Sequence, residues 1–451
     1  MKTIQKSYDA LIIGFGKGGK TLAAFLAKEG WTVAVIEQSA LMYGGTCINI
    51  ACIPTKSLVH SAETNVPYHE AVNEKNRLTS SLRQRNFEMV DNQPGATVIT
   101  GTATFVTHRQ VAVRLADIVE EVLIEAEKIF INTGAKPVVP SIPGIEQSQR
   151  IFTSTTLIDQ TKLPEELVII GAGYIALEFA SMYAQFGSRV TLLDRSATFL
   201  PNEDRDIADS IQTVLSAKGI RIEQAAQIEK IITGETADTI IYHQGEIQKE
   251  VSATAILVAT GRRPVTKDLN LSAAGVQQDD RGYIRVNEHL QTTAENIWAI
   301  GDVNGGPQFT YISLDDFRII RSQLFPKFEP HTTFDRKYVA SSLFITPPLA
   351  QVGLREHEAV KQGYRIKIAS IPAAASTRAQ ILRQTEGVLK AVVDADTNKI
   401  LGCTLFCVNS SELINQVQLA MQGGLDYTVL RDTIYTHPSS SEIFNDLFGK
   451  I

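Results

Sequence analysis

The feature that most constrains this chain is a unit that occurs twice: a short apolar strand, a glycine-rich turn and then a helix. In the first copy the apolar residues 10–13 lead into the turn 14–19, and in the second the apolar residues 166–170 lead into the turn 171–176. A strand that passes through glycines into a helix is typical of the βαβ unit that binds dinucleotides. The chain therefore predicts an α/β fold with two Rossmann-like dinucleotide-binding domains.

The three glycines of the first turn have different tasks in such a unit. Gly14 permits the tight turn, Gly16 lets the backbone approach a pyrophosphate at the helix N-terminus, and Gly19 allows the helix to pack closely on the strand. Glu37 ends the next predicted strand, 23 residues after Gly14. A carboxylate there can accept hydrogen bonds from a ribose diol, although a plain surface carboxylate is the alternative. We predict a first dinucleotide site at these residues.

The second copy repeats this spacing. Gly171 and Gly173 occupy the first two glycine positions, Ala176 replaces the third, and Asp194 follows Gly171 by 23 residues. The charge of Asp194 disfavours a 2′-phosphate, whereas Arg195 beside it could pair with one. Two fingerprints imply two dinucleotides, and we expect the second to be NADH, with NADPH left open.

Chain length, net charge and the N-terminal residues indicate how many domains the protein has and which partners it lacks. A chain of 451 residues is long enough for two to four domains. Its net charge of -6 offers no field that would attract nucleic acid or an anionic membrane. The polar N-terminal residues 1–7 contain no apolar leader, and the first apolar run is too short to cross a bilayer. We therefore expect a cytoplasmic protein without nucleic-acid or membrane partners.

Cys47 and Cys52 form the most specific cysteine pair. In a regular helix, residues five apart are separated by roughly 7.5 Å along the axis, whereas a disulfide needs a Cα separation of about 4.4 to 6.8 Å. A bond between them requires a distorted first turn, which the preceding Gly44 and Gly45 could permit. A helix N-terminus would also favour the thiolate. Metal binding is the alternative, but the spacing is not that of a zinc site, and we expect no resident metal.

Cys403 and Cys407 form a second pair of a different kind. They lie four apart on a predicted strand, a rise of roughly 13 Å, which is too far for a bond. We expect buried, apolar thiols at both positions.

These motifs together resemble the class I pyridine nucleotide-disulfide oxidoreductases, which include glutathione reductase, lipoamide dehydrogenase and mercuric reductase. The resemblance covers essentially the whole chain. It extends over the cysteine segment 44–56, Thr133-Gly134, the second fingerprint, residues 259–264, residues 299–302 and the C-terminal segment 437–442. It implies two dinucleotide-binding domains, one for FAD and one for NAD(P), followed by a C-terminal α+β dimerisation domain.

The resemblance also implies domain boundaries. The FAD-binding domain would comprise residues 1–150 and 266–337, interrupted by an NAD(P)-binding domain at 151–265. The dimerisation domain would comprise residues 338–451. The implied cofactors are FAD and either NADH or NADPH as the electron donor, and the implied assembly is an obligate homodimer.

Roles for individual residues follow from the same resemblance. Cys52 would lie against the flavin as the charge-transfer thiol, and Cys47 would be the interchange thiol that meets the acceptor. Lys56 would lie near the flavin and pair with Glu178, and Tyr174 would cover the nicotinamide pocket until the nucleotide displaces it. Asp302 would bond the ribityl chain of the flavin. The other implied cofactor-binding residues are Gly45, Thr46, Ala103, Thr133, Gly134, Gly261 and Thr310.

His437 and Glu442 form the last predicted pair. A carboxylate five residues after a histidine can orient the ring and keep it basic, as a proton shuttle to a thiol requires. In the family this histidine enters the active site of the other subunit. The resemblance therefore implies that each site is built from both chains.

Four stretches resemble the reactive chlorine resistance flavoproteins within this family: residues 42–49, 203–209, 309–316 and 344–348. That likeness implies a role in surviving hypochlorous acid, with a small molecule or a thiophilic metal ion, Cu(II) especially, as the electron acceptor. Ala51 in place of a glycine, and Phe309-Thr310-Tyr311 in place of Leu-Ala-His, disfavour a lipoamide or glutathione substrate. The alternatives are a dihydrolipoamide dehydrogenase of a 2-oxoacid dehydrogenase complex, a reductase of small disulfides, and a slow redox sensor.

Overall fold

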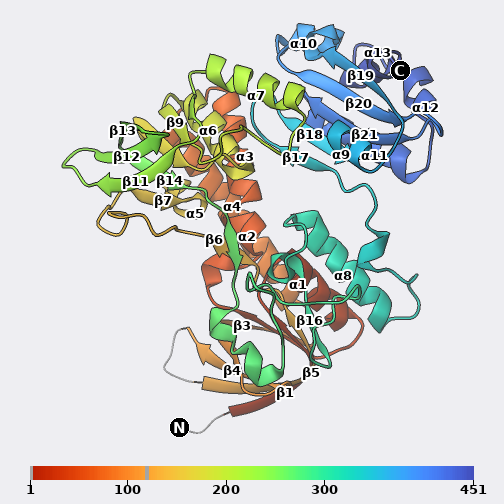
Figure 1. The fold of residues 1–451 in the computed structure, drawn as a ribbon. Coiled ribbons are helices and arrows are strands. Elements are labelled where there is room, and N and C mark those ends of the chain that lie inside the picture. Colours follow the sequence, from red (N-terminus) through yellow and green to blue (C-terminus); the bar gives the residue numbers. More distant parts are fainter. Residues whose placement is uncertain (1–3, 117–120) are drawn as a thin grey trace.

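A computed structural model describes residues 4–116 and 121–451 (Figure 1). Residues 1–3 of the polar N-terminal segment lie outside the described residues. The chain forms a first part built on a mixed sheet, a second part built on a parallel sheet and a C-terminal part built on an antiparallel sheet, with long helices between them. This is the predicted α/β class with two Rossmann-like units and a C-terminal α+β unit.

The first part is organised around a six-stranded sheet. β1 pairs in parallel with both β2 and β5, and β16 joins the far edge of β5. Its strands are β1 (Ile4–Ile13), β2 (Val33–Glu37), β3 (Ala96–Phe105), β4 (Gln110–Leu115), β5 (Glu121–Ile131) and β16 (Ile297–Ala299). The helices α1 (Lys17–Lys28) and α8 (Thr310–Leu324) pack against each other beside this sheet, although nearly 300 residues separate them in sequence. Segments before and after the second part therefore build one domain together.

The second part is a five-stranded parallel sheet in the order β10-β9-β8-β14-β7. Its strands are β7 (Ile151–Thr153), β8 (Glu166–Ile170), β9 (Arg189–Leu193), β10 (Arg221–Glu223) and β14 (Ala255–Val258). Its helices are α5 (Ser154–Leu157), α6 (Tyr174–Phe186) and α7 (Arg205–Ala217). An antiparallel sheet of β11 (Gln227–Ile232), β12 (Asp238–Gln244) and β13 (Ile247–Ala253) extends from it. The pair β6 (Ala135–Pro137) and β15 (Arg262–Pro264) carries the chain between the first two parts.

The C-terminal part is an antiparallel sheet in the order β17-β18-β21-β20-β19. Its strands are β17 (Ser341–Leu343), β18 (Leu349–Gly353), β19 (Ile366–Pro372), β20 (Val388–Asp394) and β21 (Ile400–Phe406). Its helices are α9 (Glu356–Lys361), α10 (Thr377–Leu382), α11 (Ser410–Gln422), α12 (Tyr427–Asp432) and α13 (Ile443–Phe448). We call residues 338–451 the C-terminal unit.

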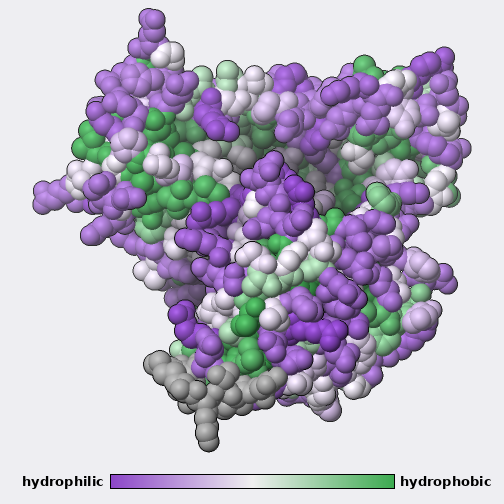
Figure 2. Space-filling view, turned by 60° about the horizontal axis from the view of Figure 1, so that its bottom comes forward, coloured by the Kyte–Doolittle hydropathy of each residue, from purple (hydrophilic) through white to green (hydrophobic). Residues whose placement is uncertain are grey.

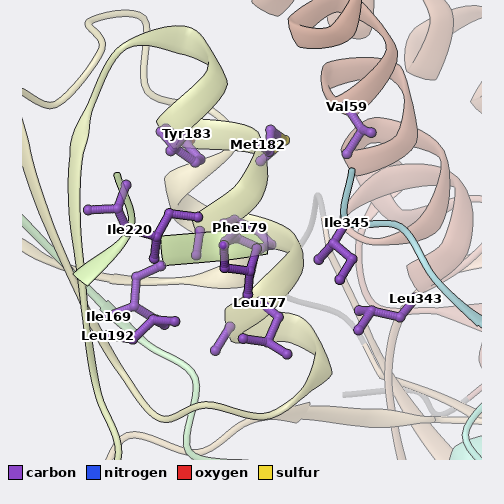
Figure 3. Packing of buried hydrophobic residues seen from close by; sticks show 14 of the residues in the cluster. Val59, Ile169, Leu177, Phe179, Met182, Tyr183, Leu192, Ile220, Leu343 and Ile345 are labelled. Atoms are coloured by element: carbon purple, nitrogen blue, oxygen red, sulfur yellow. The ribbon is translucent and has the colours of Figure 1, made fainter. Parts of the chain in front are cut away.

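The helices α2 (Thr46–Asn49), α3 (Cys52–Glu63) and α4 (Tyr68–Asp91) leave the first sheet and pack against the second part. Figure 3 shows Val59 of α3 beside Leu343 and Ile345 of the C-terminal unit, with Phe179 and Met182 of α6 in the same buried cluster. Three parts of the chain thus share one hydrophobic core. This shared core fixes the cysteine helix α3 relative to the second fingerprint helix α6.

Hydrophilic residues predominate on the face seen in Figure 2. Within residues 4–116 and 121–451, no helix combines the length and apolar character needed to cross a membrane.

Candidate active site

The helix that carries the two cysteines is broken between them. α2 ends at Asn49, and α3 begins at Cys52 after Ile50 and Ala51 adopt φ values of -140° and -138°. Neither residue is helical, so the axial separation of a continuous helix does not apply. The distortion that a bond between Cys47 and Cys52 requires is therefore present. It lies at Ile50 and Ala51, between the two cysteines, and not at the glycines that precede Cys47.

The two thiols interact directly, and their acidities differ as a result. A hydrogen bond from Cys47 lowers the pKa of Cys52 to about 6, against the opposing effect of burial and with further help from Thr310 and Lys56. The same hydrogen bond and burial raise the pKa of the Cys47 thiol well above its usual range. This interaction favours the thiolate form of Cys52 over that of Cys47.

The N-terminus of α8 meets this pair. The Oγ1 atom of Thr310, the first residue of α8, lies 3.4 Å from Sγ of Cys52. The neighbouring rings of Phe309 and Tyr311 stack with centroids 5.0 Å apart, and the Tyr311 hydroxyl donates to the carbonyl of Ala340 at 2.6 Å. Burial and the nearby Cys52 thiolate raise the pKa of Tyr311 to about 12. A hydroxyl and the positive end of a helix dipole thus stabilise the thiolate.

Lys56 and Glu178 are brought together as expected. Nζ of Lys56 lies 2.7 Å from Oε2 of Glu178 and 4.8 Å from the centroid of the Phe344 ring. The Oε1 atom of Glu178 accepts the backbone N–H of Phe344 at 2.9 Å. The ammonium is therefore held at one place, one helical turn from Cys52.

A single cavity of about 690 Å³ connects these groups to the first fingerprint. Its volume is in the range of cofactor pockets. The predicted residues that line it are Gly14, Gly16, Glu37, Gly45, Thr46, Cys47, Cys52, Lys56, Ala103, Thr133, Gly134, Tyr174, Glu178, Asp302 and Thr310. Gly19, Gly171, Gly173, Asp194, Arg195, Gly261, His437 and Glu442 are not among its lining residues.

The first fingerprint closes around Asn132, a residue that the sequence analysis did not single out. Its Oδ1 atom accepts the N–H of Gly19 at 3.0 Å, and its Nδ2 atom donates to the carbonyl of Ile300 at 2.7 Å. A Cβ atom added to Gly16 would lie 2.5 Å from this Oδ1 atom. The only feature of the sequence that could have pointed to Asn132 as a site residue is its position directly before Thr133-Gly134. Its role depends on contacts that sequence spacing does not reveal.

The cavity fits an anionic dinucleotide at this end. α1 begins after Gly16 with no acidic residue in its first turn, so the positive end of its dipole favours a pyrophosphate there. The N–H groups of Gly18 and Gly19 already donate to Ser313 and Asn132, so Gly16 and Lys17 at the cavity wall are the residues whose backbone would approach the pyrophosphate. Glu37 is 7% exposed at the end of β2 and accepts the N–H groups of Phe15 and Ser39. Burial raises the pKa of Glu37 to about 7. A ribose diol would supply donors to this desolvated carboxylate, so the residues present fit FAD.

The second fingerprint has the same local geometry. Gly171 has φ +112°, and a Cβ atom there would lie 2.6 Å from the carbonyl oxygen of Ala259. Gly173 precedes α6 without a capping side chain and has no atom within 4 Å of an added Cβ. Burial raises the pKa of Asp194, which stands after β9, and the adjacent Arg195 is exposed. Asp194 and Arg195, the residues that bear on the choice between NADH and NADPH, therefore lie at the end of β9 and do not line the cavity.

His437 and Glu442 pair within the C-terminal unit. Nδ1 of His437 lies 2.7 Å from Oε1 of Glu442, and the histidine side chain is 69% exposed. Hydrogen bonds from His437 and from the N–H of Ser439 lower the pKa of Glu442. Within a single chain this pair is exposed to solvent and does not line the cavity that contains Cys47 and Cys52.

The remaining cysteines are buried as expected. Cys403 is 3% exposed in β21 and Cys407, just beyond the strand, is 4% exposed. Burial raises the pKa of both thiols, to about 12 for Cys407. Across the described part of the chain, no group of three or more His, Cys, Asp or Glu side chains is placed to hold a metal ion.

The model of the pyridine nucleotide-disulphide oxidoreductase family matches residues 8–316, and the model of the dimerisation domain of that family matches residues 339–448. A probable pyridine nucleotide-disulfide oxidoreductase, RclA of Escherichia coli K12, is 48% identical over 98% of this chain and 99% of its own length. A mercuric reductase of Lysinibacillus sphaericus is 33% identical over 97% of this chain and 81% of its own length.

Solved structures agree with these sequences. The HOCl-induced flavoprotein disulfide reductase RclA from Escherichia coli superimposes with a TM-score of 0.94 at 49% identity, covering 98% of this chain and 99% of that one. A Cu(II) complex of the same protein gives a TM-score of 0.94 at 48% identity, with the same coverage.

Proposed function

This chain belongs to the pyridine nucleotide-disulphide oxidoreductases, and we propose that it passes electrons from NAD(P)H through Cys47 and Cys52 to an external acceptor. The family is FAD-dependent and uses a pyridine nucleotide as its electron donor. The observation that carries the proposal is that Cys47 and Cys52 both lie at the wall of the cofactor-sized cavity, with Sγ of Cys52 3.4 Å from Oγ1 of Thr310 at the N-terminus of α8. We propose that this reductase acts in defence against reactive chlorine, as the likeness to the HOCl-induced flavoprotein supports.

The residues that would hold FAD are those of the first fingerprint, Glu37 and Asp302, together with the wall formed by Thr46, Ala103 and Thr133. When bound, FAD supplies a ring that exchanges a hydride with nicotinamide and electrons with sulfur. Lys56 places a cation at this wall, and Thr310 and α8 hold Cys52 as the thiolate. Cys47 is the thiol left to meet the acceptor.

We propose a thiophilic or redox-active metal ion, Cu(II) foremost, as the acceptor. Cysteine sulfur is the ligand that Cu(I) prefers, so the reduced pair can bind the ion, with Cys47 giving up its proton, while electrons pass to it. The Cu(II) complex of the Escherichia coli relative and the mercuric reductase relatives support a metal acceptor. Metal would be a substrate here, bound by a pair of thiols rather than by a larger cluster of ligands.

We propose further that the active unit is a homodimer in which His437 serves the other subunit. The C-terminal match to a dimerisation domain supports this assembly. The exposed pair His437–Glu442 is then free to enter the partner's site and move a proton to or from a thiol. Ile434, 99% exposed in one chain, lies close to it in sequence and would be covered.

An anaerobic acceptor panel tests the proposed function. The purified protein with FAD is mixed with NADH or NADPH and with Cu(II), glutathione disulfide or lipoamide, and nucleotide oxidation is followed by absorbance. We expect turnover with Cu(II), and its loss in Cys47→Ser. Turnover of lipoamide or glutathione disulfide alone would discard the metal acceptor, and no oxidation of either nucleotide would discard the reductase.

A further inference from the structure

Tyr174 stands where the second fingerprint meets the cavity. It is the first residue of α6, directly after Gly173, and its ring lines the cavity together with Lys56 and Glu178. The side chain is not simply exposed, because its hydroxyl donates a 2.6 Å hydrogen bond to Oε1 of Glu203. Burial and the charge of Glu203 both raise the pKa of Tyr174, so the phenol stays protonated and keeps donating.

Glu203 is itself held from the C-terminal unit. The residue is 4% exposed and follows β9, whereas its partners Arg355 and Gln351 belong to the region of β18 and α9. Nη2 of Arg355 lies 2.8 Å from Oε1 of Glu203, and Nε lies 3.0 Å from Oε2. The side-chain amide of Gln351 donates to the same Oε2 atom.

Arg355 and Gln351 hold the Glu203 carboxylate independently of Tyr174. Burial alone would raise the pKa of Glu203, but the hydrogen bonds from Arg355 and Tyr174 outweigh it and hold the pKa below its usual value. If Tyr174 moves, the bidentate guanidinium and the Gln351 amide still satisfy the carboxylate. When Tyr174 moves away, only its hydrogen bond to Glu203 is given up, and the buried carboxylate keeps its other partners.

We propose that Glu203 is a positioning residue that latches Tyr174 across the entrance to the nicotinamide pocket, with Arg355 fixing the latch from the C-terminal unit. The inference rests on the proposed function, since it takes the nicotinamide to enter beside Tyr174. The latch disfavours nucleotide binding by the strength of one hydrogen bond and shields the flavin side of the cavity between turnovers.

The test compares four forms of the enzyme with FAD bound: wild type, Tyr174→Phe, Glu203→Gln and the double variant. Affinity for NAD+ and NADP+ is measured by calorimetric titration, and flavin reduction by NADH and NADPH is measured by stopped flow. Tyr174→Phe keeps the ring and the Glu203–Arg355 pair but removes the hydroxyl. We expect this variant to bind the preferred nucleotide about 3- to 10-fold more tightly, the net worth of one hydrogen bond.

The double variant distinguishes a latch from a merely structural ion pair. If Glu203 acts through Tyr174, Glu203→Gln tightens binding in the wild type and changes it little in the Tyr174→Phe background. A purely structural Glu203 would weaken binding equally in both backgrounds. Tyr242→Phe, which removes a buried hydroxyl bonded to Arg221 in the same part of the chain, is the matched control and should leave binding unchanged.

Unchanged or weaker nucleotide binding by Tyr174→Phe would overturn the latch, even if Glu203→Gln failed to fold. A wild-type protein that takes up FAD but binds neither NAD+ nor NADP+, and is reduced by neither donor, would overturn the proposed function itself. Tighter binding in Tyr174→Phe without coupling to Glu203 would show that Glu203 is not the latch.

Discussion

Lys56 and Glu178 form a 2.7 Å ion pair that joins the cysteine helix α3 to the second fingerprint helix α6. The second oxygen of the same carboxylate accepts the backbone N–H of Phe344, so the C-terminal unit also takes part. One side chain thus fixes the lysine relative to the thiols and to the cavity wall. The position of the cation depends on all three parts of the fold.

Glu178→Gln should slow flavin reduction by NAD(P)H about 10-fold, the effect of losing one charge-assisted hydrogen bond at the reacting centre. Glutamine still accepts from Phe344, so the thermal midpoint should change little. Stopped-flow absorbance measures the rate. Glu166→Gln, which breaks an exposed pair with Arg189, is the control and should have no effect. Equal rates in wild type and Glu178→Gln would remove the ion pair from the mechanism.

Cys47→Ala should raise the pKa of Cys52, because it removes the hydrogen bond that contributes most to lowering it. The thiolate persists above the pKa and is lost as the pH falls through it. Alkylation of Cys52 by iodoacetamide should therefore stay fast down to a pH of about 6 in the reduced wild type. In Cys47→Ala the decline should begin at a higher pH than in the wild type, because Thr310 and Lys56 are left to oppose burial without Cys47. Mass spectrometry across pH provides the profile, and superimposable profiles would refute the assignment.

Gly16→Ala and Gly173→Ala should behave differently although both are second glycines of a fingerprint. An added Cβ at Gly16 would lie 2.5 Å from Oδ1 of Asn132, so we expect loss of FAD and a lower thermal midpoint. Gly173 has φ -76° and open space around it, so Gly173→Ala should keep its fold and FAD. It should bind NAD(P)H about 10-fold or more weakly, since the methyl group blocks backbone approach to the pyrophosphate. Flavin content and nucleotide titration provide the comparison, and full flavin retention in Gly16→Ala would contradict it.

His437→Ala should impair reoxidation of the reduced enzyme by the acceptor about 100-fold, within the range of a lost general acid or base. Flavin reduction by NAD(P)H should stay unchanged, and the dimer should remain intact by analytical ultracentrifugation. His243→Ala removes a histidine that is paired with Glu229 in the second part and serves as the control. Unchanged reoxidation in His437→Ala would exclude the histidine as the proton shuttle.

The local features of the site could be predicted from the sequence, because glycine positions and the cysteine segment are set by nearby residues. Gly14 and Gly171 both adopt positive φ where the turn requires it. The contacts of Asn132 and Glu203 could not be predicted in this way. Gly19 and Asn132 are 113 residues apart, and Glu203 and Arg355 are 152 apart. Such pairs form only when separate sheets pack together, and no spacing in the sequence encodes that packing.

We propose that electrons from nicotinamide leave through the sulfur atoms of Cys47 and Cys52. The most direct measurement is thiol labelling with mass spectrometry of the oxidised holoenzyme, before and after one equivalent of NAD(P)H is added without oxygen. We predict that Cys47 and Cys52 change together from unlabelled to labelled, while the labelling of Cys403 and Cys407 does not change. Oxidation of the nucleotide with no change at Cys47 and Cys52 would contradict the account.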